Sequence, residues 1–308
     1  MKKVVITGAS GFIGKALTKH LLDKGVQVWA IVRDKNKIQE FYNYKNINII
    51  EAEFCWYQEL EKLVIERTFD CFYHVAWDGM YGESFADYAK QINNIRFTCD
   101  AFESSRKLQC KKFVFVGTVG QYEVRKYIEH NINDLRITTI YGMSKLTAEM
   151  VLKTLANKYN DIELNIVHLA KVYGEGDNSR TITRVLLETL LKGESPKLSV
   201  GEFLYDWIYV GDVAKGMAAV GKYGINKKSY YVGHRKIERF KDIVRKVGAI
   251  LAPNIKLRFG EYTDSASIDY SKINLDDLYN DTGFEAQSDF KESILKTAQW
   301  IKKSEELL

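Results

Sequence analysis

A glycine-rich segment close to the N-terminus constrains the fold of this chain more than any other feature. It has the sequence TGASGFIG at residues 7–14 and follows the apolar run at 4–6 directly. Apolar residues then recur at helical spacing, so the segment is predicted to join a first strand to a first helix. Glycines at such a junction let backbone amides approach a pyrophosphate, and the helix N-terminus adds partial positive charge. The pattern predicts a dinucleotide-binding cradle, with a tight turn that holds no ligand as the alternative.

The first half of the chain alternates short β-rich runs with helical patterns, which is typical of βαβ units and a parallel sheet. Strands are predicted at residues 4–6, 26–32, 47–50, 71–76, 113–116 and 164–169, and helices at about 14–23, 59–66, 85–105 and 141–159. This order predicts an α/β fold with a doubly wound parallel Rossmann sheet.

The regular alternation weakens beyond about residue 172. A helix is predicted near 181–192, and the runs at 207–210 and 230–232 are strand-like, so we expect the chain to re-enter the main sheet. The predicted organisation is a dinucleotide-binding Rossmann domain over 1–172, re-entered at about 204–234. A smaller, interleaved substrate-binding lobe is expected mainly over 173–308.

Composition excludes several classes of protein. A chain of 308 residues with 46% hydrophobic content can bury a large core, and its N-terminal apolar run is too short for a signal peptide or a membrane span, so we expect a cytoplasmic protein without membrane partners. The net charge of +5 is dispersed and forms no basic block, which argues against nucleic acid as a partner. The four cysteines lack metal-ligand spacing, so reduced thiols and no metal are expected.

The end of the second predicted strand bears on the choice of cofactor. Arg33 stands near the distance from the glycines at which an acid would hold a ribose 2′-hydroxyl and an Arg would accommodate a 2′-phosphate. A guanidinium matches phosphate geometry, so NADP(H) is favoured. The alternative is that Asp34, one residue later, contacts the ribose and the cofactor is NAD(H).

Two further segments predict an acid/base set. Tyr141 and Lys145 stand four residues apart in YGMSK on a predicted helix, so their side chains share one face. An ammonium beside a phenol favours the phenolate and lowers a pKa that starts near ~10, which suits proton transfer at neutral pH. Taken alone, this spacing also fits an ordinary amphipathic helix. Thr118 ends the apolar run 113–117 at the carboxyl edge of the sheet, where its hydroxyl is predicted to hold a substrate carbonyl oxygen.

These motifs together resemble the extended short-chain dehydrogenases/reductases, the branch that includes nucleotide-sugar epimerases, dehydratases and reductases. The resemblance rests on TGASGFIG, HVAW at 74–77, Thr118 with Tyr122, YGMSK, VYG at 172–174, DWIYVGDVA at 206–214 and the tail from Gly283 to Trp300, and covers nearly the whole chain. It implies a homodimer formed through the Tyr141 helix and the long helix before Phe113. It also implies catalytic roles for Thr118, Tyr141, Lys145 and Asn94, with the adjacent Asn93 leaving the last assignment open. The expected cofactor-binding residues are Gly8, Ser10, Gly11, Phe12, Ile13, Gly14, Arg33, Ala76, Tyr141 and Lys145.

The chain also departs from the family pattern. Members usually have Arg where His168 stands, Asn where Lys171 stands, and Arg where Tyr205 precedes Asp206. The last Arg often contacts the substrate diphosphate, a role for which Lys171, Arg180, Lys197 and Arg258 are the candidate substitutes. The Asp-Glu pair of family dehydratases is replaced by Val119-Gly120, so dehydration is not expected.

The favoured hypothesis is an NADP(H)-dependent reductase of a keto-sugar, and a nucleotide-linked 4-keto-6-deoxysugar is the expected substrate. A cofactor phosphate bound by Arg33 indicates NADPH, which serves as a consumed reductant. The alternative enzyme is an NAD-dependent nucleotide-sugar 4-epimerase, which oxidises and then re-reduces one carbon. A catalytically silent NAD(P)-binding regulatory protein is a third hypothesis, against which the intact Thr118, Tyr141 and Lys145 argue.

Overall fold

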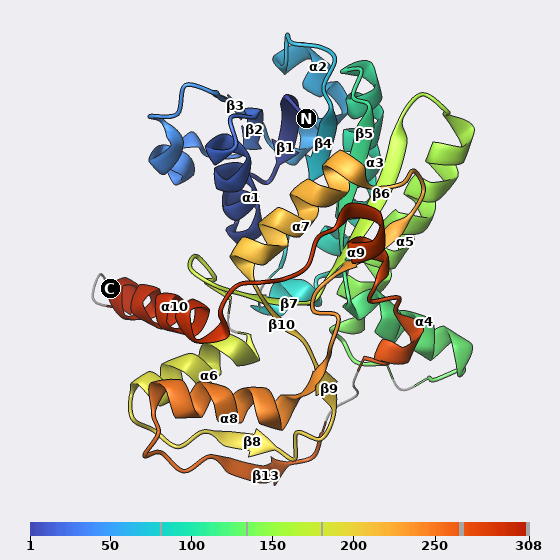
Figure 1. The fold of residues 1–308 in the computed structure, drawn as a ribbon. Coiled ribbons are helices and arrows are strands. Elements are labelled where there is room, and N and C mark those ends of the chain that lie inside the picture. Colours follow the sequence, from blue (N-terminus) through green and yellow to red (C-terminus); the bar gives the residue numbers. More distant parts are fainter. Residues whose placement is uncertain (81, 134, 180, 265–267, 306–308) are drawn as a thin grey trace.

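A seven-stranded sheet forms the centre of the larger part of the molecule (Figure 1). The computed structural model describes residues 1–80, 82–133, 135–179, 181–264 and 268–305. The strands lie in the order β11, β6, β5, β4, β1, β2, β3, and every pairing between neighbours is parallel. Their bounds are β1 Lys3–Thr7, β2 Gln27–Val32, β3 Ile47–Glu51, β4 Cys71–His74, β5 Lys112–Thr118, β6 Glu163–Leu169 and β11 Ser229–Val232.

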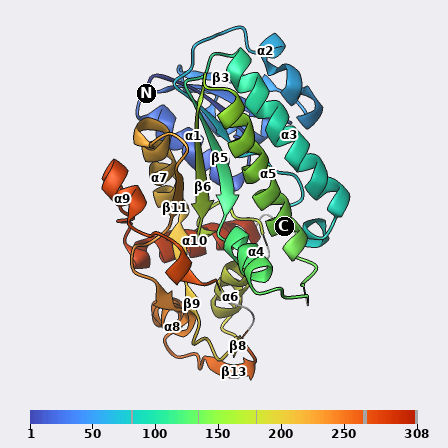
Figure 2. The ribbon, with the colours of Figure 1, turned by 90° about the vertical axis from the view of Figure 1, so that its right-hand side faces the viewer.

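Helices cover both faces of this sheet, as Figure 2 shows from the side. One face is covered by α1 (Phe12–Asp23) and α7 (Val210–Tyr223), whose Leu17 and Met217 belong to one buried apolar cluster. The other face is covered by α3 (Tyr88–Lys107) and α5 (Thr139–Lys158), with Phe102 and Leu152 in a second cluster. A strand covered on both faces has no solvated side, which is why the central strands are apolar at nearly every position.

The remaining elements on this part of the chain are short. They are α2 Leu60–Leu63, α4 Gly120–Glu129 and the 3₁₀ helices η1 Lys35–Phe41, η2 Phe54–Glu59 and η3 Gly82–Phe85.

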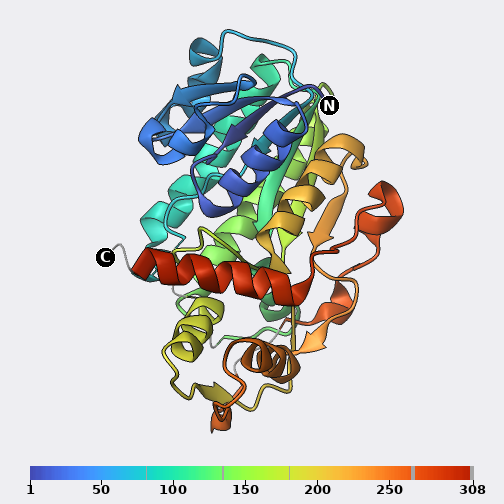
Figure 3. The ribbon, with the colours of Figure 1, turned by 60° about the vertical axis from the view of Figure 1, so that its left-hand side comes forward.

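A smaller lobe lies beyond the carboxyl edge of the sheet and has an apolar cluster of its own. Figure 3 shows α10 (Phe290–Glu305) crossing between the sheet and the rest of this lobe, where it contacts α6 (Ile182–Leu191) and α8 (Phe240–Leu251). The other elements of the lobe are β7 Lys171–Tyr173 with β10 Trp207–Tyr209, β8 Lys197–Ser199 with β13 Arg258–Tyr262, and β9 Leu204–Tyr205 with β12 Glu238–Arg239. The last two short elements, η4 Tyr270–Lys272 and α9 Asp277–Thr282, instead pack on the larger part, where Tyr270 and Leu278 join the apolar cluster of α1 and α7.

The predicted α/β fold with a doubly wound parallel sheet is confirmed. Two local predictions differ from the structure, and one helix was not predicted. The strand expected at 207–210 pairs with β7 in a separate ladder, so only β11 extends the main sheet in that region. The helix expected at 59–66 is reduced to Leu60–Leu63, because Val64 takes up an extended backbone. The helix α4 was not predicted.

The described residues contain neither a membrane-spanning helix nor a cluster of metal-binding side chains. No helix in the ranges given above is long and apolar enough to cross a membrane. Within the same ranges, no group of three or more His, Cys, Asp or Glu side chains is placed to hold a metal ion.

Candidate active site

The glycine-rich segment forms a tight turn between β1 and α1. Gly8 has a φ of +71°, and a Cβ added to it would lie 2.7 Å from the Cα of Ala76. A Cβ on Gly14 would collide with the carbonyl oxygen of Gly8. Packing therefore requires these two glycines whether or not a ligand binds. A Cβ on Gly11 would make only an ordinary contact, at 3.4 Å from the Gly8 oxygen, so its packing gives no reason for a glycine there.

The first turn of α1 has the features of an anion-binding site. Gly11 is the N-cap and is exposed, and no side chain in the described structure caps this helix end. The first turn contains no acidic residue. The amides of Phe12 and Ile13 therefore lack a side-chain acceptor at the point where the helix dipole favours negative charge. Together with half-buried Ser10 beside them, these residues fit the pyrophosphate of a dinucleotide.

Arg33 and Asp34 follow β2 at the same edge of the sheet, and their side chains differ in the contacts that they make within the protein. The Arg33 side chain is 54% exposed, and its Nη1 lies 3.5 Å from Asp78 Oδ1, at the limit of an ion pair. The Asp34 carboxylate accepts a hydrogen bond from the amide of Asn36 at 2.9 Å and caps the 3₁₀ helix η1. The guanidinium is thus the more available of the two groups for a ligand.

Thr118 ends β5, and its backbone and hydroxyl are both held. The Thr118 amide donates to Gln121 Oε1 at 2.8 Å, and its Oγ1 accepts from the Gly120 amide at 3.2 Å. Because that oxygen accepts from the protein, its O–H remains able to donate to a ligand. A Cβ on Gly142 would lie 3.2 Å from the carbonyl oxygen of Gly120, so the start of α5 packs closely beside the start of α4, two residues after Thr118.

Tyr141 and Lys145 lie on the same α5 face, and Trp77 contacts both. The rings of Trp77 and Tyr141 meet edge to face with centroids 6.2 Å apart. The Lys145 Nζ lies 3.8 Å from the Trp77 ring centroid and donates to the Val116 carbonyl at 2.6 Å, two residues before Thr118. Lys145 is buried, and this desolvation lowers its pKa well below the usual value. The structure thus brings Thr118, Tyr141 and Lys145 to one edge of the sheet.

Asn94 and Ala76 occupy supporting positions. Asn94 is buried, accepts from the Asp78 amide and donates to the Asp78 carbonyl, both at 2.8 Å. Its neighbour Asn93 is exposed, so only Asn94 faces the loop after β4. Ala76 packs on Gly8, which links that loop to the cradle.

Glu149 is the centre of a buried network that the sequence patterns did not indicate. Its oxygens accept from Gln121 Nε2 at 2.6 Å, His168 Nε2 at 2.7 Å and, nearer the surface, Arg125 and Lys153 at 3.0 and 2.6 Å. Burial alone would raise the pKa of Glu149, but these partners hold it at about 2. Since Gln121 also bonds to Thr118, the charge on Glu149 supports the end of β5, which carries the candidate catalytic hydroxyl.

Lys171 is the best placed of the cations that were considered for substrate phosphate. It begins β7 just beyond the carboxyl edge of β6, and its amide donates to the Asp206 carbonyl at 3.1 Å. The side chain is exposed, yet desolvation by the surrounding protein lowers its pKa. The Lys171 ammonium is therefore accessible to a ligand and only partly solvated.

The other candidate cations are placed less favourably. Lys197 and Arg258 are partners in the β8–β13 ladder at the far end of the lobe (Figure 1), where the Arg258 guanidinium donates to the Ser195 carbonyl. Arg180 lies outside the described residues. Tyr205, at the position of the family Arg, is half-buried.

His234 is a further group near Lys171 that the sequence analysis missed. Its amide and Nδ1 bond to the two oxygens of buried Asp206, at 2.8 and 2.6 Å. This hydrogen bond raises the pKa of His234. Only the fold reveals the pairing, because these residues are far apart in sequence.

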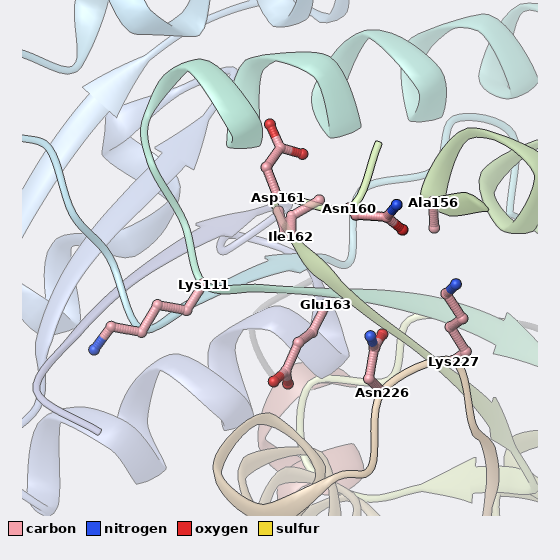
Figure 4. A pocket seen from close by; sticks show the side chains of 8 residues that line it. All are labelled: Lys111, Ala156, Asn160, Asp161, Ile162, Glu163, Asn226 and Lys227. Atoms are coloured by element: carbon pink, nitrogen blue, oxygen red, sulfur yellow. The ribbon is translucent and has the colours of Figure 1, made fainter. Parts of the chain in front are cut away.

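A hollow of about 270 Å³ lies at the opposite edge of the sheet and does not belong to this site (Figure 4). Its lining comes from the amino ends of β5 and β6 and from the loop before β11, and comprises Lys111, Ala156, Asn160, Asp161, Ile162, Glu163, Asn226 and Lys227. Ligands of open α/β sheets bind at the carboxyl ends of the strands, so we assign it no role in the reaction.

Comparison with known proteins now identifies the family. Residues 4–233 match the model of the NAD dependent epimerase/dehydratase family. The chain belongs to that family. It is therefore an enzyme of the extended short-chain dehydrogenase/reductase group, which comprises NAD(P)-dependent epimerases, dehydratases and reductases, as the motifs predicted.

Several members of the family are similar over most of their length. A CDP-abequose synthase from Yersinia pseudotuberculosis is 26% identical over 302 residues, which is 95% of this chain and 98% of the relative. A dTDP-4-dehydro-6-deoxyglucose reductase from Escherichia coli is 22% identical over 256 residues, covering 79% of this chain and 80% of the relative.

Solved structures of the family share the fold. The UDP-glucose 4-epimerase of Thermotoga maritima, solved with UDP-glucose, aligns with a TM-score of 0.76 at 19% identity over 98% of this chain and 99% of that one. The Bordetella bronchiseptica enzyme WbmF, solved with NADH, aligns with a TM-score of 0.78 at 22% identity over 99% of this chain and 93% of that one.

Proposed function

We propose that this enzyme is an NADP(H)-dependent reductase that converts a nucleotide-linked 4-keto-6-deoxysugar to the corresponding alcohol. The observation that carries the proposal is the contrast between Arg33 and Asp34 at the end of β2. An exposed guanidinium suits a 2′-phosphate, whereas the neighbouring carboxylate already caps η1. An enzyme that selects the phosphorylated dinucleotide is suited to net reduction.

The roles of the side chains follow from their positions. NADPH supplies the hydride when bound. The Thr118 hydroxyl, whose oxygen accepts from Gly120, donates to the substrate carbonyl oxygen and orients it. Tyr141 transfers its phenolic proton to the same oxygen as negative charge develops there. Lys145 places a cation beside that phenol and supports proton transfer.

The residues after Thr118 argue against dehydration. Val119 is buried, and Gly120, which has no side chain, begins α4. Elimination of water from a sugar needs further acid/base groups, and neither residue supplies one. The proposal therefore places the substrate after a dehydration step that another enzyme performs.

The nucleotide-linked substrate class is supported by Lys171 and by the relatives. Thr118 pairs with Leu169 at the end of β6, and Lys171 follows two residues later with an exposed ammonium. A substrate diphosphate that reached this ammonium would gain a charge-assisted contact. Two of the relatives are a CDP-abequose synthase and a dTDP-4-dehydro-6-deoxyglucose reductase, and we extend the reductase chemistry of the second to this chain.

A 4-epimerase is the second candidate function, favoured by the solved relatives. These include a UDP-glucose 4-epimerase and an enzyme with bound NADH. An epimerase regenerates its cofactor in each cycle, so it predicts a dinucleotide that co-purifies with the protein and no net change in cofactor absorbance. The catalytically silent alternative predicts no turnover with any sugar nucleotide.

We also propose that the enzyme is a homodimer. The outer faces of α3 and α5 expose large apolar side chains, namely Tyr88, Ile92, Met143 and Met150, which are 44–68% accessible. These helices contact each other along the sheet, so the exposed groups lie on neighbouring elements. A second copy of the same surface would bury them.

The proposal is tested by assay with a panel of 4-keto-6-deoxysugars linked to CDP, dTDP, UDP and GDP. NADPH and NADH are compared at equal concentration while nicotinamide absorbance is followed. Reduction predicts stoichiometric loss of NADPH absorbance with at least one sugar and slower loss with NADH. If none of the sugars consumes cofactor and extraction yields tightly bound NAD, the epimerase hypothesis replaces this one.

A further inference from the structure

The segment after β4 is fixed by two buried amides on one face of α3. Gln91 Oε1 accepts from the Trp77 indole Nε1 at 2.8 Å, while its Nε2 donates to the carbonyls of Gly79 and Ser84, each at 3.0 Å. Asn94, three residues later, accepts a hydrogen bond from the Asp78 amide and donates one to the Asp78 carbonyl. Five hydrogen bonds from two side chains thus hold this segment. So many bonds over a short stretch leave Trp77 little freedom of position.

The fixed indole ring lies against the acid/base pair. Trp77 is 8% exposed, and its ring face covers the Lys145 ammonium at 3.8 Å, closer than the Phe115 ring at 4.9 Å. The same indole meets the Tyr141 ring edge to face, and Phe85 also packs edge to face with that phenol, with centroids 4.8 Å apart. Trp77 therefore touches both members of the pair.

The physical problem at this position is to keep a buried ammonium charged. Desolvation favours the neutral amine. The Val116 carbonyl opposes this through a hydrogen bond of 2.6 Å. An aromatic face opposes it as well, because its negative quadrupole attracts a cation, and indole is the best of the aromatic side chains for this purpose.

We propose that Trp77 is a positioning residue of the proton-transfer site, which holds the Lys145 ammonium in its charged form against Val116 and beside Tyr141. This inference rests on the proposed function for its role in catalysis, but the contact itself can be tested without substrate. Gln91 fixes the position and orientation of the indole by accepting the hydrogen bond from Trp77 Nε1.

Other charged groups near Lys145 do not account for its stabilisation. His74, at the end of β4, is buried between Thr7 and Thr98; burial and the Lys145 charge lower its pKa to about 3, so it is neutral. Glu149 lies one helical turn further along α5, but its oxygens are bonded to the network described above. Tyr141 is the remaining titratable group on this helix face.

The test is to measure the ionisation of Lys145 in Trp77 variants. Protein with ¹³C-labelled lysine is titrated by NMR, and the Lys145 signal is assigned by its absence in Lys145→Arg. Trp77→Leu removes the π face, so the ratio of charged to neutral Lys145 at a given pH is expected to fall about tenfold. Trp77→Phe keeps a smaller aromatic face, so in this variant the same ratio is expected to fall only about threefold. Trp29→Leu serves as the control, because the Trp29 ring packs against Phe69 with centroids 5.0 Å apart. This variant should leave the titration of Lys145 unchanged.

Activity supplies a second measurement. The kcat of Trp77→Leu should fall and that of Trp77→Phe should be largely restored, with KM within about twofold of the parent because Trp77 is not assigned to substrate binding. A folded Trp77→Leu protein whose Lys145 titrates as in the parent would overturn the inference. If that variant does not fold, an unchanged titration in Trp77→Phe has the same meaning. Absence of turnover with every sugar, combined with the expected NMR shift, would instead reject the proposed function and leave the contact intact.

Discussion

Oε2 of Glu149 lies 2.7 Å from Nε2 of His168, and both side chains are buried. The same oxygen accepts from Gln121, whose own oxygen accepts from the Thr118 amide. One buried carboxylate therefore connects α5, which carries Tyr141 and Lys145, to the end of β5, which carries the candidate catalytic hydroxyl of Thr118. The relative position of the two parts of the site depends on that charge.

Replacement of Glu149 by Gln is expected to reduce stability in a pH-dependent manner. The pKa of Glu149 is about 2 in the folded protein and 4.5 as its usual value, so its pairing stabilises the fold above about pH 4.5. This contribution, roughly 3 kcal/mol, is lost as pH falls towards 2. The free energy of unfolding is measured with urea at a series of pH values from neutral to acid. The parent should exceed the variant by a large margin at pH 7, and this margin should decrease as the pH is lowered. Glu163→Gln, whose carboxylate is 49% exposed, is the control; a constant difference across this range would contradict the assignment.

Removal of the Tyr141 hydroxyl tests the proposed proton donor. Tyr141→Phe should lower kcat by about 100-fold to 10,000-fold, which is the usual contribution of a positioned general acid. Binding of NADPH, followed by calorimetry, should change little, because the cradle at the start of α1 is untouched. A variant with normal turnover would remove Tyr141 from the reaction.

The cofactor preference depends on Arg33. Arg33→Ala is expected to weaken NADPH binding about tenfold to 100-fold, since a charge-assisted phosphate contact is lost. NADH affinity should stay within about twofold, because NADH has no 2′-phosphate to lose. Lys35→Ala removes a cation two residues away and provides the matched comparison. Equal losses for both cofactors would indicate that Arg33 only supports the fold.

The substrate diphosphate is predicted to contact Lys171. Lys171→Met should raise the KM for the sugar nucleotide about tenfold and weaken inhibition by the free nucleoside diphosphate to a similar extent. Lys197→Met, in the ladder at the far end of the lobe, should leave both constants unchanged. If the two variants give the same KM and the same inhibition constant, the substrate phosphate does not bind at Lys171.

The dimer proposal predicts that charge on the apolar face of α3 and α5 dissociates the protein. Ile92→Glu and Met150→Glu should each sediment as monomers at concentrations where the parent is dimeric, because burial of an unpaired carboxylate is costly. Ile65 is 90% exposed and lies outside these helices, so Ile65→Glu should sediment with the same molecular mass as the parent. A monomeric parent would end this proposal.

The sequence predicted those parts of the molecule that depend on local patterns. The glycine turn after β1, Thr118 at the end of β5 and the shared helix face of Tyr141 and Lys145 all follow from short-range spacing combined with the order of strands. The structure places them where that reasoning expected, and the family comparison confirms the fold.

Features that depend on long-range packing could not be predicted. Trp77 meets Lys145 across 68 positions of sequence, and the Asp206 to His234 pairing joins segments on either side of α7. Amphipathic α4 was missed because it begins two residues after the end of β5, with no connecting segment that marks its start. Charge alone did not separate Lys171 from Lys197 and Arg258; only the fold shows that the latter two lie in the outer ladder.

The most direct test of the central claim is transfer of deuterium from NADPH that carries the label at C4 of the nicotinamide. We predict that the enzyme moves one deuteron to C4 of a 4-keto-6-deoxysugar nucleotide, detected as a single mass increment in the alcohol product. The Tyr141→Phe protein should yield almost none of that product. An unlabelled product, or interconversion of two sugar epimers with no consumption of NADPH, would contradict the account.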